Sequence, residues 1–153
     1  AHKALAVKFK NREIKKEYLA FVKGKVKNDT GSIDSPIGRH KTQRKKMGTG
    51  GNHSRPACTN YQVLQRCKSW TYLKLLPETG RTHQIRVHLA SLHHPVIGDK
   101  LYGGKNSNSG TLKMDRQALH ASHLELNHPV SEVPLSFSAN LPIDMENFLQ
   151  SHK

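Results

Sequence analysis

The sequence has few acidic residues and no long apolar run. Its 11 aspartates and glutamates face 25 lysines and arginines, so the formal net charge is +14 and the pI is about 10.0. No stretch approaches the roughly 20 apolar residues of a membrane-spanning helix, and the basic segments lack the bulky apolar face of a helix that lies on a membrane. The charge therefore favours a polyanionic partner, and nucleic acid fits better than an anionic membrane.

Cysteine is also scarce, which argues against a disulfide framework. Cys58 and Cys67 lie nine positions apart in a stretch that we expect to be extended, without C-x-x-C spacing. No apolar secretory segment precedes the first charged residues, so we expect a reducing, cytoplasmic setting. The sequence starts at Ala1 instead of Met, which indicates that the natural N-terminus lies elsewhere.

The length of 153 residues fits one domain or a piece of a larger one, and no internal repeat or domain boundary is visible. Hydrophobic spacing predicts helices at 1–10, 82–93 and 143–150, with Leu5 and Phe9 packing inward in the first and Thr82 as N-cap of the second. Strands are predicted at 17–22, 59–68, 70–77, 119–126 and 133–137. Strand 70–77 is apolar on both faces and should be central, whereas Pro134 makes the last strand an edge.

Positive charge is concentrated in two regions. Residues 38–52 carry basic side chains among glycines, and we predict a mobile basic loop there. Between Lys3 and Lys27, nine lysines and arginines face only Glu13 and Glu17. Charge runs are often solvated faces, but this one-sided excess favours a surface that follows phosphates. Residues 105–110 are predicted to be a polar insertion.

The eleven histidines do not show the spacing of a metal site. His120 and His123 are three apart in a predicted strand and therefore point to opposite faces. His83 and His88 are five apart on a predicted helix and again do not share a face. We predict no metal site, and contacts of a few histidines with phosphates or bases are the better interpretation.

Residues 78–89, ETGRTHQIRVHL, are the most informative segment. The end of a strand, a glycine turn and the start of a helix place Arg81 beside the first helical amides, which makes a site for a carboxylate or phosphate. His83, Gln84, Arg86 and His88 are expected on the helix surface. The alternative is that Arg81 only caps a surface turn and that His83 and His88 are solvated.

This segment resembles the signature of the RluA family of pseudouridine synthases. In the same order follow HPVIGD at 94–99 and LYG at 101–103, and further similar pieces are KEYLA at 16–20, GSIDSPIG at 31–38, RQALH at 116–120 and HPV at 128–130. The resemblance extends from about Lys3 to the final helix. It therefore covers nearly the whole chain.

The resemblance implies an α+β domain with a mixed, mostly antiparallel sheet, flanking helices and a cleft for RNA. The enzyme extrudes one uridine and rejoins its base through carbon 5, without a metal or organic cofactor, and large-subunit ribosomal RNA is the first expectation. Tyr18, in KEYLA, matches the tyrosine that stacks on the target base; without the resemblance it would be read as a core strand residue. Arg81 matches the arginine that pairs with the catalytic carboxylate.

The family's catalytic aspartate belongs to an H-R-L-D-x-x-T-S-G motif, which normally lies shortly before the first helix and does not occur in these 153 residues. None of the aspartates present has this context, and turn or loop roles are expected for Asp34 and Asp99. We therefore expect residues 1–153 to be the C-terminal larger part of a catalytic domain, without a second domain, and to be inactive alone. A preceding segment is then a possible partner; the alternative is a non-catalytic RNA-binding module or pseudoenzyme.

Two further expectations follow. If a catalytic strand is missing from the sheet, the exposed edge should cause poor solubility or association. The residues expected to contact RNA come from the basic loop and the second helix: Arg39, His40, Lys41, Arg44, Lys45, Lys46, His83, Gln84 and Arg86. For Arg86 the alternative is an ion pair with a structural acid.

Overall fold

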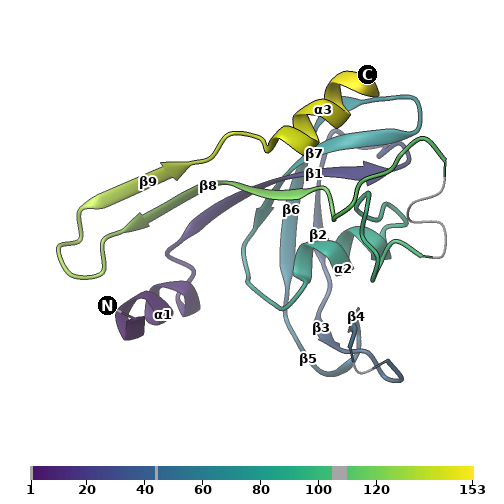
Figure 1. Ribbon diagram of the computed structural model, residues 1–153. Coiled ribbons are helices and arrows are strands. Elements are labelled where there is room, and N and C mark those ends of the chain that lie inside the picture. The colour runs from purple at the N-terminus through teal and green to yellow at the C-terminus, as the bar shows by residue number, and fades with distance from the viewer. Residues whose placement is uncertain (1, 44, 105–109) are drawn as a thin grey trace.

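The computed structural model describes residues 2–43, 45–104 and 110–153. Its main feature is a six-stranded sheet with the order β2-β6-β7-β1-β8-β9, in which all described neighbours are antiparallel. The strands are β1 (Lys15–Lys23), β2 (Thr30–Asp34), β6 (Cys58–Arg66), β7 (Trp70–Pro77), β8 (Leu119–Asn127) and β9 (Pro134–Ser138). The predicted α+β class is confirmed, with helices α1 (His2–Lys10), α2 (Gln84–Ser91) and α3 (Ile143–Ser151) (Figure 1).

The core forms around the two central strands, β1 and β7. The ring of Phe21 on β1 lies 5.0 Å from that of Trp70 on β7 and 5.3 Å from that of Phe148 on α3, measured between centroids. Helix α2 lies on the other side of the sheet (Figure 1), where Ile85 and Leu89 join the same core. The central position predicted for β7 is therefore confirmed.

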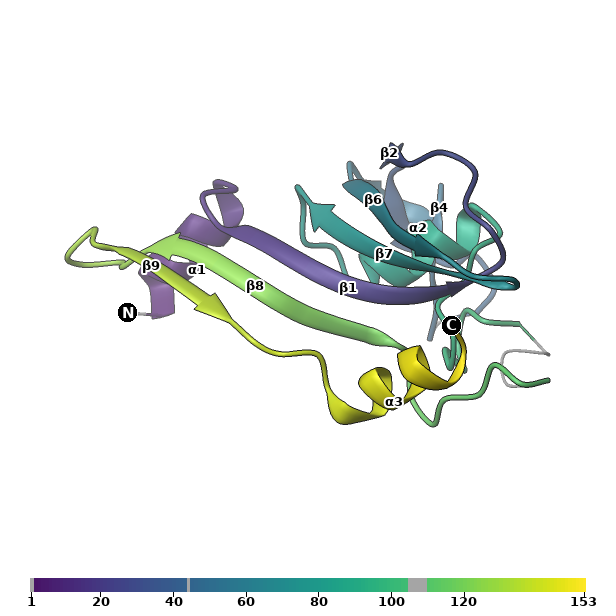
Figure 2. The same ribbon diagram turned by 90° about the horizontal axis from the view of Figure 1, so that it is seen from above.

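The sheet divides where β1 and β7 separate. Pairing between them ends at Tyr18 and Leu75; beyond this pair β1 continues with β8 alone and β7 with β6 alone. We call the opening between residues 14–17 and 76–78 the sheet fork (Figure 2). It explains why Leu76 is 39% exposed, although the sequence predicted that both faces of this strand are covered.

The prediction of a mobile basic loop is wrong, because this region forms a second sheet. Its order is β4-β3-β5, with β3 (Ile37–Arg39), β4 (Met47–Thr49) and β5 (Asn52–Arg55). Ile37 is 2% exposed and packs in a small cluster with Ala57 and Val87 of α2, which fixes the sheet against the main body. The side chains of Arg39, His40, Lys41 and Lys45 are exposed and that of Lys46 is half-buried. Arg44 and most of the predicted polar insertion lie outside the described residues.

Helix α1 forms as predicted, but its inward residue is different. Phe9 is 53% exposed, so its predicted inward packing is wrong, whereas Lys8 is buried. The Lys8 ammonium donates to both carboxylate oxygens of Glu132 at 3.0 Å and to Glu13 at 3.4 Å. This contact holds α1 against the loop between β8 and β9, and the three elements extend together away from the core (Figure 2).

The predicted edge strand is confirmed, since β9 is the last strand of the sheet. Phe137 of β9 and Val133, which directly precedes the strand, are each 54% exposed. None of the described helices is long and apolar enough to cross a membrane.

Candidate functional site

A cavity of about 430 Å³ lies between β1, the turn after β7 and the start of α2. It brings together the two residues predicted to be catalytic, Tyr18 and Arg81, which are far apart in the sequence. The lining also includes Lys16, Pro77, Thr79, Gly80, His83, Gln84, Ile85, Arg86, Gln117 and Leu119. The predicted site residues of β1 and α2 therefore share one cavity.

Tyr18 occupies an irregular point of β1. It pairs with Leu75 on one side and Ala121 on the other, and the register with β8 shifts between Glu17 and Tyr18. A β-bulge of this kind changes the direction of the side chain that follows it. The Tyr18 side chain is half-buried, packs against the core and lines the cavity, so it is supported by the core while part of it remains accessible.

Arg81 lies in the turn between β7 and α2. Its Nε donates to the carbonyl oxygen of Pro56 at 3.0 Å, and no described carboxylate comes within 4.0 Å of its guanidinium. It also lines a second cavity, of about 310 Å³, with Arg39 and Met47 of the small sheet. The terminal nitrogens of Arg81 are thus free, among the described residues, to bind an anion at the junction of the two cavities.

Gln84 fixes this turn and does not face solvent. It is 4% exposed. Its amide oxygen accepts from Thr79 Oγ1 at 2.7 Å and from the Arg81 backbone amide at 3.0 Å, and its Nε2 donates to the Cys58 carbonyl and to Thr59 Oγ1, both at 2.9 Å. The predicted surface position of Gln84 is wrong, and its hydrogen-bonding groups are occupied within the protein, so we no longer assign it to RNA.

The start of α2 also differs from the prediction. The helix begins at Gln84, and its N-cap is His83 in the left-handed region (φ 55°) without a side-chain capping bond, so Thr82 is not the cap. His88 is fully buried, where its Nδ1 meets Thr59 Oγ1 and its Nε2 meets the Ser35 carbonyl, both at 2.9 Å. Burial lowers the pKa of His88. The surface position predicted for His88 is therefore wrong, and it joins α2 to β6.

Arg86 meets a structural acid, which was the alternative to an RNA contact. Its Nε and Nη2 donate to the two oxygens of Asp99 at 2.7 and 2.8 Å, and the Asp99 carboxylate is fully buried. Asp99 Oδ1 also accepts from the backbone amides of Leu101 and Tyr102. Burial opposes ionisation, but the hydrogen bonds from Arg86 and these amides hold the pKa of Asp99 below its usual value. Asp99 has the turn role that the sequence predicted for it.

Tyr102 connects this ion pair to His83 and the small sheet. The Arg86 guanidinium lies 5.0 Å above the centre of the Tyr102 ring, and the Tyr102 hydroxyl is 2.9 Å from His83 Nδ1. The same hydroxyl accepts from the Met47 amide of β4 at 2.9 Å. Burial and the charge of Arg86 lower the pKa of His83, which favours the neutral imidazole. The sequence included Tyr102 in a family-like motif but gave it no site role.

Lys16 is another lining residue that the sequence left without a role. It precedes Tyr18 by two positions in β1, and burial lowers the pKa of its ammonium. No described carboxylate lies within 4.0 Å of it, although its Nζ is 5.9 Å from the centre of the Phe9 ring. Within the described residues, no three potential metal ligands lie close enough together to hold an ion.

Comparison with known proteins gives the family. The RNA pseudouridylate synthase model matches residues 1–91. The chain is 45% identical over 151 residues to the ribosomal large subunit pseudouridine synthase D of Nitrosomonas europaea and 40% identical over 159 residues to that of Escherichia coli K12. These alignments cover 96% and 98% of this chain but 43% and 48% of the relatives, so the chain spans about half their length.

Two solved human structures share the fold. Human RNA pseudouridylate synthase domain containing 1 aligns with a TM-score of 0.79 and 26% identity over 97% of this chain and 69% of that one. Human RNA pseudouridylate synthase domain containing 4 aligns with a TM-score of 0.76 and 27% identity, over 97% of this chain and 66% of that one. Together with the ordered motifs of the sequence, these matches show that the chain belongs to the RNA pseudouridylate synthase family and is of the RluA type.

Proposed function

We propose that the cavity between β1 and α2 binds an extruded uridine of RNA for isomerisation to pseudouridine. The observation that carries this proposal is that Tyr18 lines the same cavity as Arg81, an arginine that has no carboxylate partner among the described residues. An aromatic ring replaces part of the base stacking that is lost when a nucleotide leaves the RNA. The arginine provides the counter-charge for the carboxylate that the reaction needs.

The surrounding residues keep these two groups in place. Gln84 bonds the turn that carries Arg81 to β6, and Tyr18 packs against the core. The buried Arg86–Asp99 pair fixes the first turn of α2 and so supports the position of His83. Such preorganisation contributes to catalysis because little rearrangement is needed when the substrate binds.

RNA binding would extend from the cavity onto the small sheet. Arg39 and Arg81 line the adjoining cavity of about 310 Å³, and exposed basic residues continue over the turn between β3 and β4. The charge of +14 supports contact with phosphates. Since the relatives from N. europaea and E. coli are ribosomal large subunit pseudouridine synthases, we propose the RNA of that subunit as the substrate, in the cytoplasm.

We propose that residues 1–153 act as the C-terminal larger part of one catalytic domain, and that catalysis requires the H-R-L-D-x-x-T-S-G motif in addition. The second candidate is an RNA-binding module without catalysis, which also fits Arg81, whose terminal guanidinium nitrogens have no partner among the described residues. Uridine isomerisation is measured by nucleoside chromatography of ribosomal RNA after incubation with the 153-residue chain and with a longer gene product that contains the motif.

We expect product only with the longer protein, and none after Arg81→Ala in that protein. Isomerisation by the 153-residue chain would contradict the requirement for the motif. A longer protein that binds RNA without any turnover would favour the RNA-binding module.

A further inference from the structure

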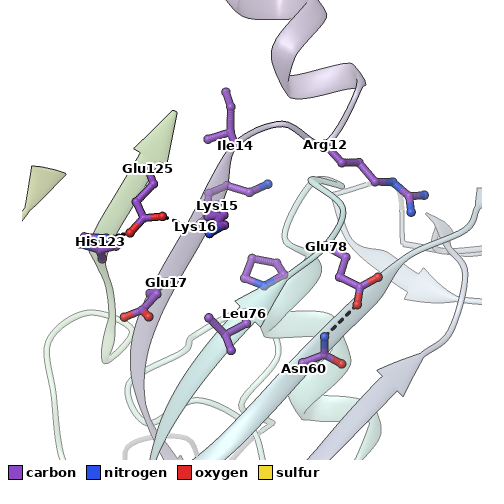
Figure 3. A pocket seen from close by; sticks show the side chains of 11 residues that line it. Arg12, Ile14, Lys15, Lys16, Glu17, Asn60, Leu76, Glu78, His123 and Glu125 are labelled. Atoms are coloured by element: carbon purple, nitrogen blue, oxygen red, sulfur yellow. Dashed lines mark hydrogen bonds and ion pairs between the residues drawn. The ribbon is translucent and has the colours of Figure 1, made fainter. Parts of the chain in front are cut away.

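The two ends of strands β1 and β7 differ in charge. At the sheet fork, a cavity of about 530 Å³ has acids among its basic residues (Figure 3). Three glutamates and three lysines or arginines line it: Glu17, Glu78, Glu125, Arg12, Lys15 and Lys16. The charges at the fork therefore largely balance.

Three segments meet at the opposite end, where β1 stops and β6 turns into β7 (Figure 2). They are residues 23–29, 66–70 and 92–95. The Gly24 amide donates to the Ser69 carbonyl at 2.8 Å, and the Lys23 amide donates to the Pro95 carbonyl at 3.0 Å. These bonds bring the three segments into one surface.

This surface is strongly basic. The three segments contain five lysines and arginines and one acid, Asp29, which pairs with Arg66 at 2.7 Å. Lys25, Lys27 and Lys68 are exposed, and no described carboxylate lies within 4.0 Å of their ammonium groups. We call these three lysines the lysine patch. Its charge is not neutralised within the described part of the protein.

The backbone that carries Lys25 and Lys27 is held firmly. Thr71 Oγ1 donates to the Gly24 carbonyl at 2.8 Å and accepts from the Val26 amide at 3.1 Å. Arg66 donates from Nε to the Val26 carbonyl at 2.7 Å and from Nη2 to the Lys27 carbonyl at 2.8 Å. The Val26 side chain is 5% exposed, so the segment is anchored between its two exposed lysines. A fixed backbone reduces the conformational freedom that these lysines lose on binding an anion.

We propose that the lysine patch binds phosphates of the RNA strand that continues beyond the uridine cavity. Lys23 lies five positions after Tyr18 in β1, so the patch begins about 16 Å from the stacking tyrosine at about 3.3 Å per residue. A stacked strand advances about 3.4 Å per nucleotide, so this distance corresponds to about five nucleotides. The inference rests on the proposed function, because it adds a second contact for the same RNA.

The test measures binding of two oligouridylates, of 3 and 15 nucleotides, by fluorescence anisotropy at several salt concentrations. The variant combines Lys25→Gln with Lys27→Gln. For the 15-mer it should reduce the slope of log affinity against log salt by about 1.4, since each lost contact with a single strand contributes about 0.7. Between 50 and 200 mM salt the wild-type chain should then lose about sevenfold more affinity than the variant. The 3-mer is too short to reach the patch and should bind both chains equally.

Two control variants test the position and the chemistry of the patch. Lys3→Gln with Lys10→Gln removes two exposed lysines from α1, near the fork end, and should leave the slope for the 15-mer unchanged. Lys25→Arg with Lys27→Arg keeps the charge and should retain the wild-type slope. The proposal is overturned if the glutamine variant at 25 and 27 keeps the wild-type slope. It is also overturned if the α1 variant or the arginine variant reduces the slope equally.

Failure of this inference can be separated from failure of the proposed function. A normal slope for the glutamine variant, together with loss of 3-mer binding in Tyr18→Ala, would refute the lysine patch alone. A reduced slope for the glutamine variant, together with unchanged 3-mer binding in Tyr18→Ala, would contradict the uridine site alone.

Discussion

Replacing Asp99 with asparagine should destabilise the fold by about 3–5 kcal/mol, the usual cost of removing one partner from a buried ion pair. The Asp99 carboxylate is fully buried and the Arg86 side chain is 15% exposed, so water cannot replace the lost charge. In the wild-type chain the Asp99 carboxylate accepts hydrogen bonds from the backbone amides of Leu101 and Tyr102, and the side-chain oxygen of asparagine can still accept them. The loss therefore reports the uncompensated charge of Arg86.

The matched control is Asp144→Asn. Asp144 pairs with Arg116 at 2.8 Å, but the two side chains are 42% and 41% exposed, so this pair is screened by solvent and should contribute at most about 1 kcal/mol. The assay is equilibrium unfolding in urea, with the midpoint and slope compared for both variants. A loss at Asp99 no larger than that at Asp144 would refute the reasoning.

The pH dependence gives an independent check. Because the folded pKa of Asp99 lies below the unfolded value of about 3.9, its contribution is fully present above that value and is lost as pH falls through the folded pKa. The wild-type chain should therefore lose more stability than Asp99→Asn as the pH falls from about 4 to about 2. Parallel curves in this range would show that the carboxylate is not stabilised by folding.

Three further predictions concern RNA and association. Tyr18→Ala should weaken oligouridylate binding by about 5- to 150-fold in fluorescence anisotropy, from a stacking loss of about 1–3 kcal/mol, whereas Tyr18→Phe should bind like wild type; equal losses would exclude stacking. Arg39→Ala should reduce the slope of log affinity against log salt by about one, and an unchanged slope would remove Arg39 from the phosphate contacts. Light scattering should show concentration-dependent association that Phe137→Lys on β9 reduces, and a wild-type chain that stays monomeric would disprove it.

Local patterns predicted most of the main sheet but not the small one. The alternation of Tyr61 and Val63 and the apolar run of β7 are strong local signals, because these strands face a large core. The strands of the small sheet have only three or four residues, which is too short to show an alternation of apolar and polar side chains. The small sheet depends on Ile37, which packs against Val87, 50 positions later, and no local pattern contains that contact.

The site shows the same limit. The resemblance predicted that Tyr18 and Arg81 are site residues. Their position in one cavity depends on the strand register that pairs Tyr18 with Leu75, which no local pattern predicts. The helix start was misplaced because Gln84 is fixed by Thr79 and by β6, not by a capping hydroxyl. In α1, apolar spacing favoured Phe9, whereas the partner that decides the packing, Glu132, is 124 residues away from Lys8.

The Tyr102 hydroxyl connects the small sheet to the cavity that Tyr18 lines. Tyr102 accepts a hydrogen bond from the Met47 amide of β4 and shares another with His83. If RNA binding displaced β4, the hydrogen bond available to His83 would change, and by reciprocity protonation of His83 would change the affinity of the small sheet for RNA. RNA binding at the small sheet and protonation in the cavity would then be coupled through this one side chain.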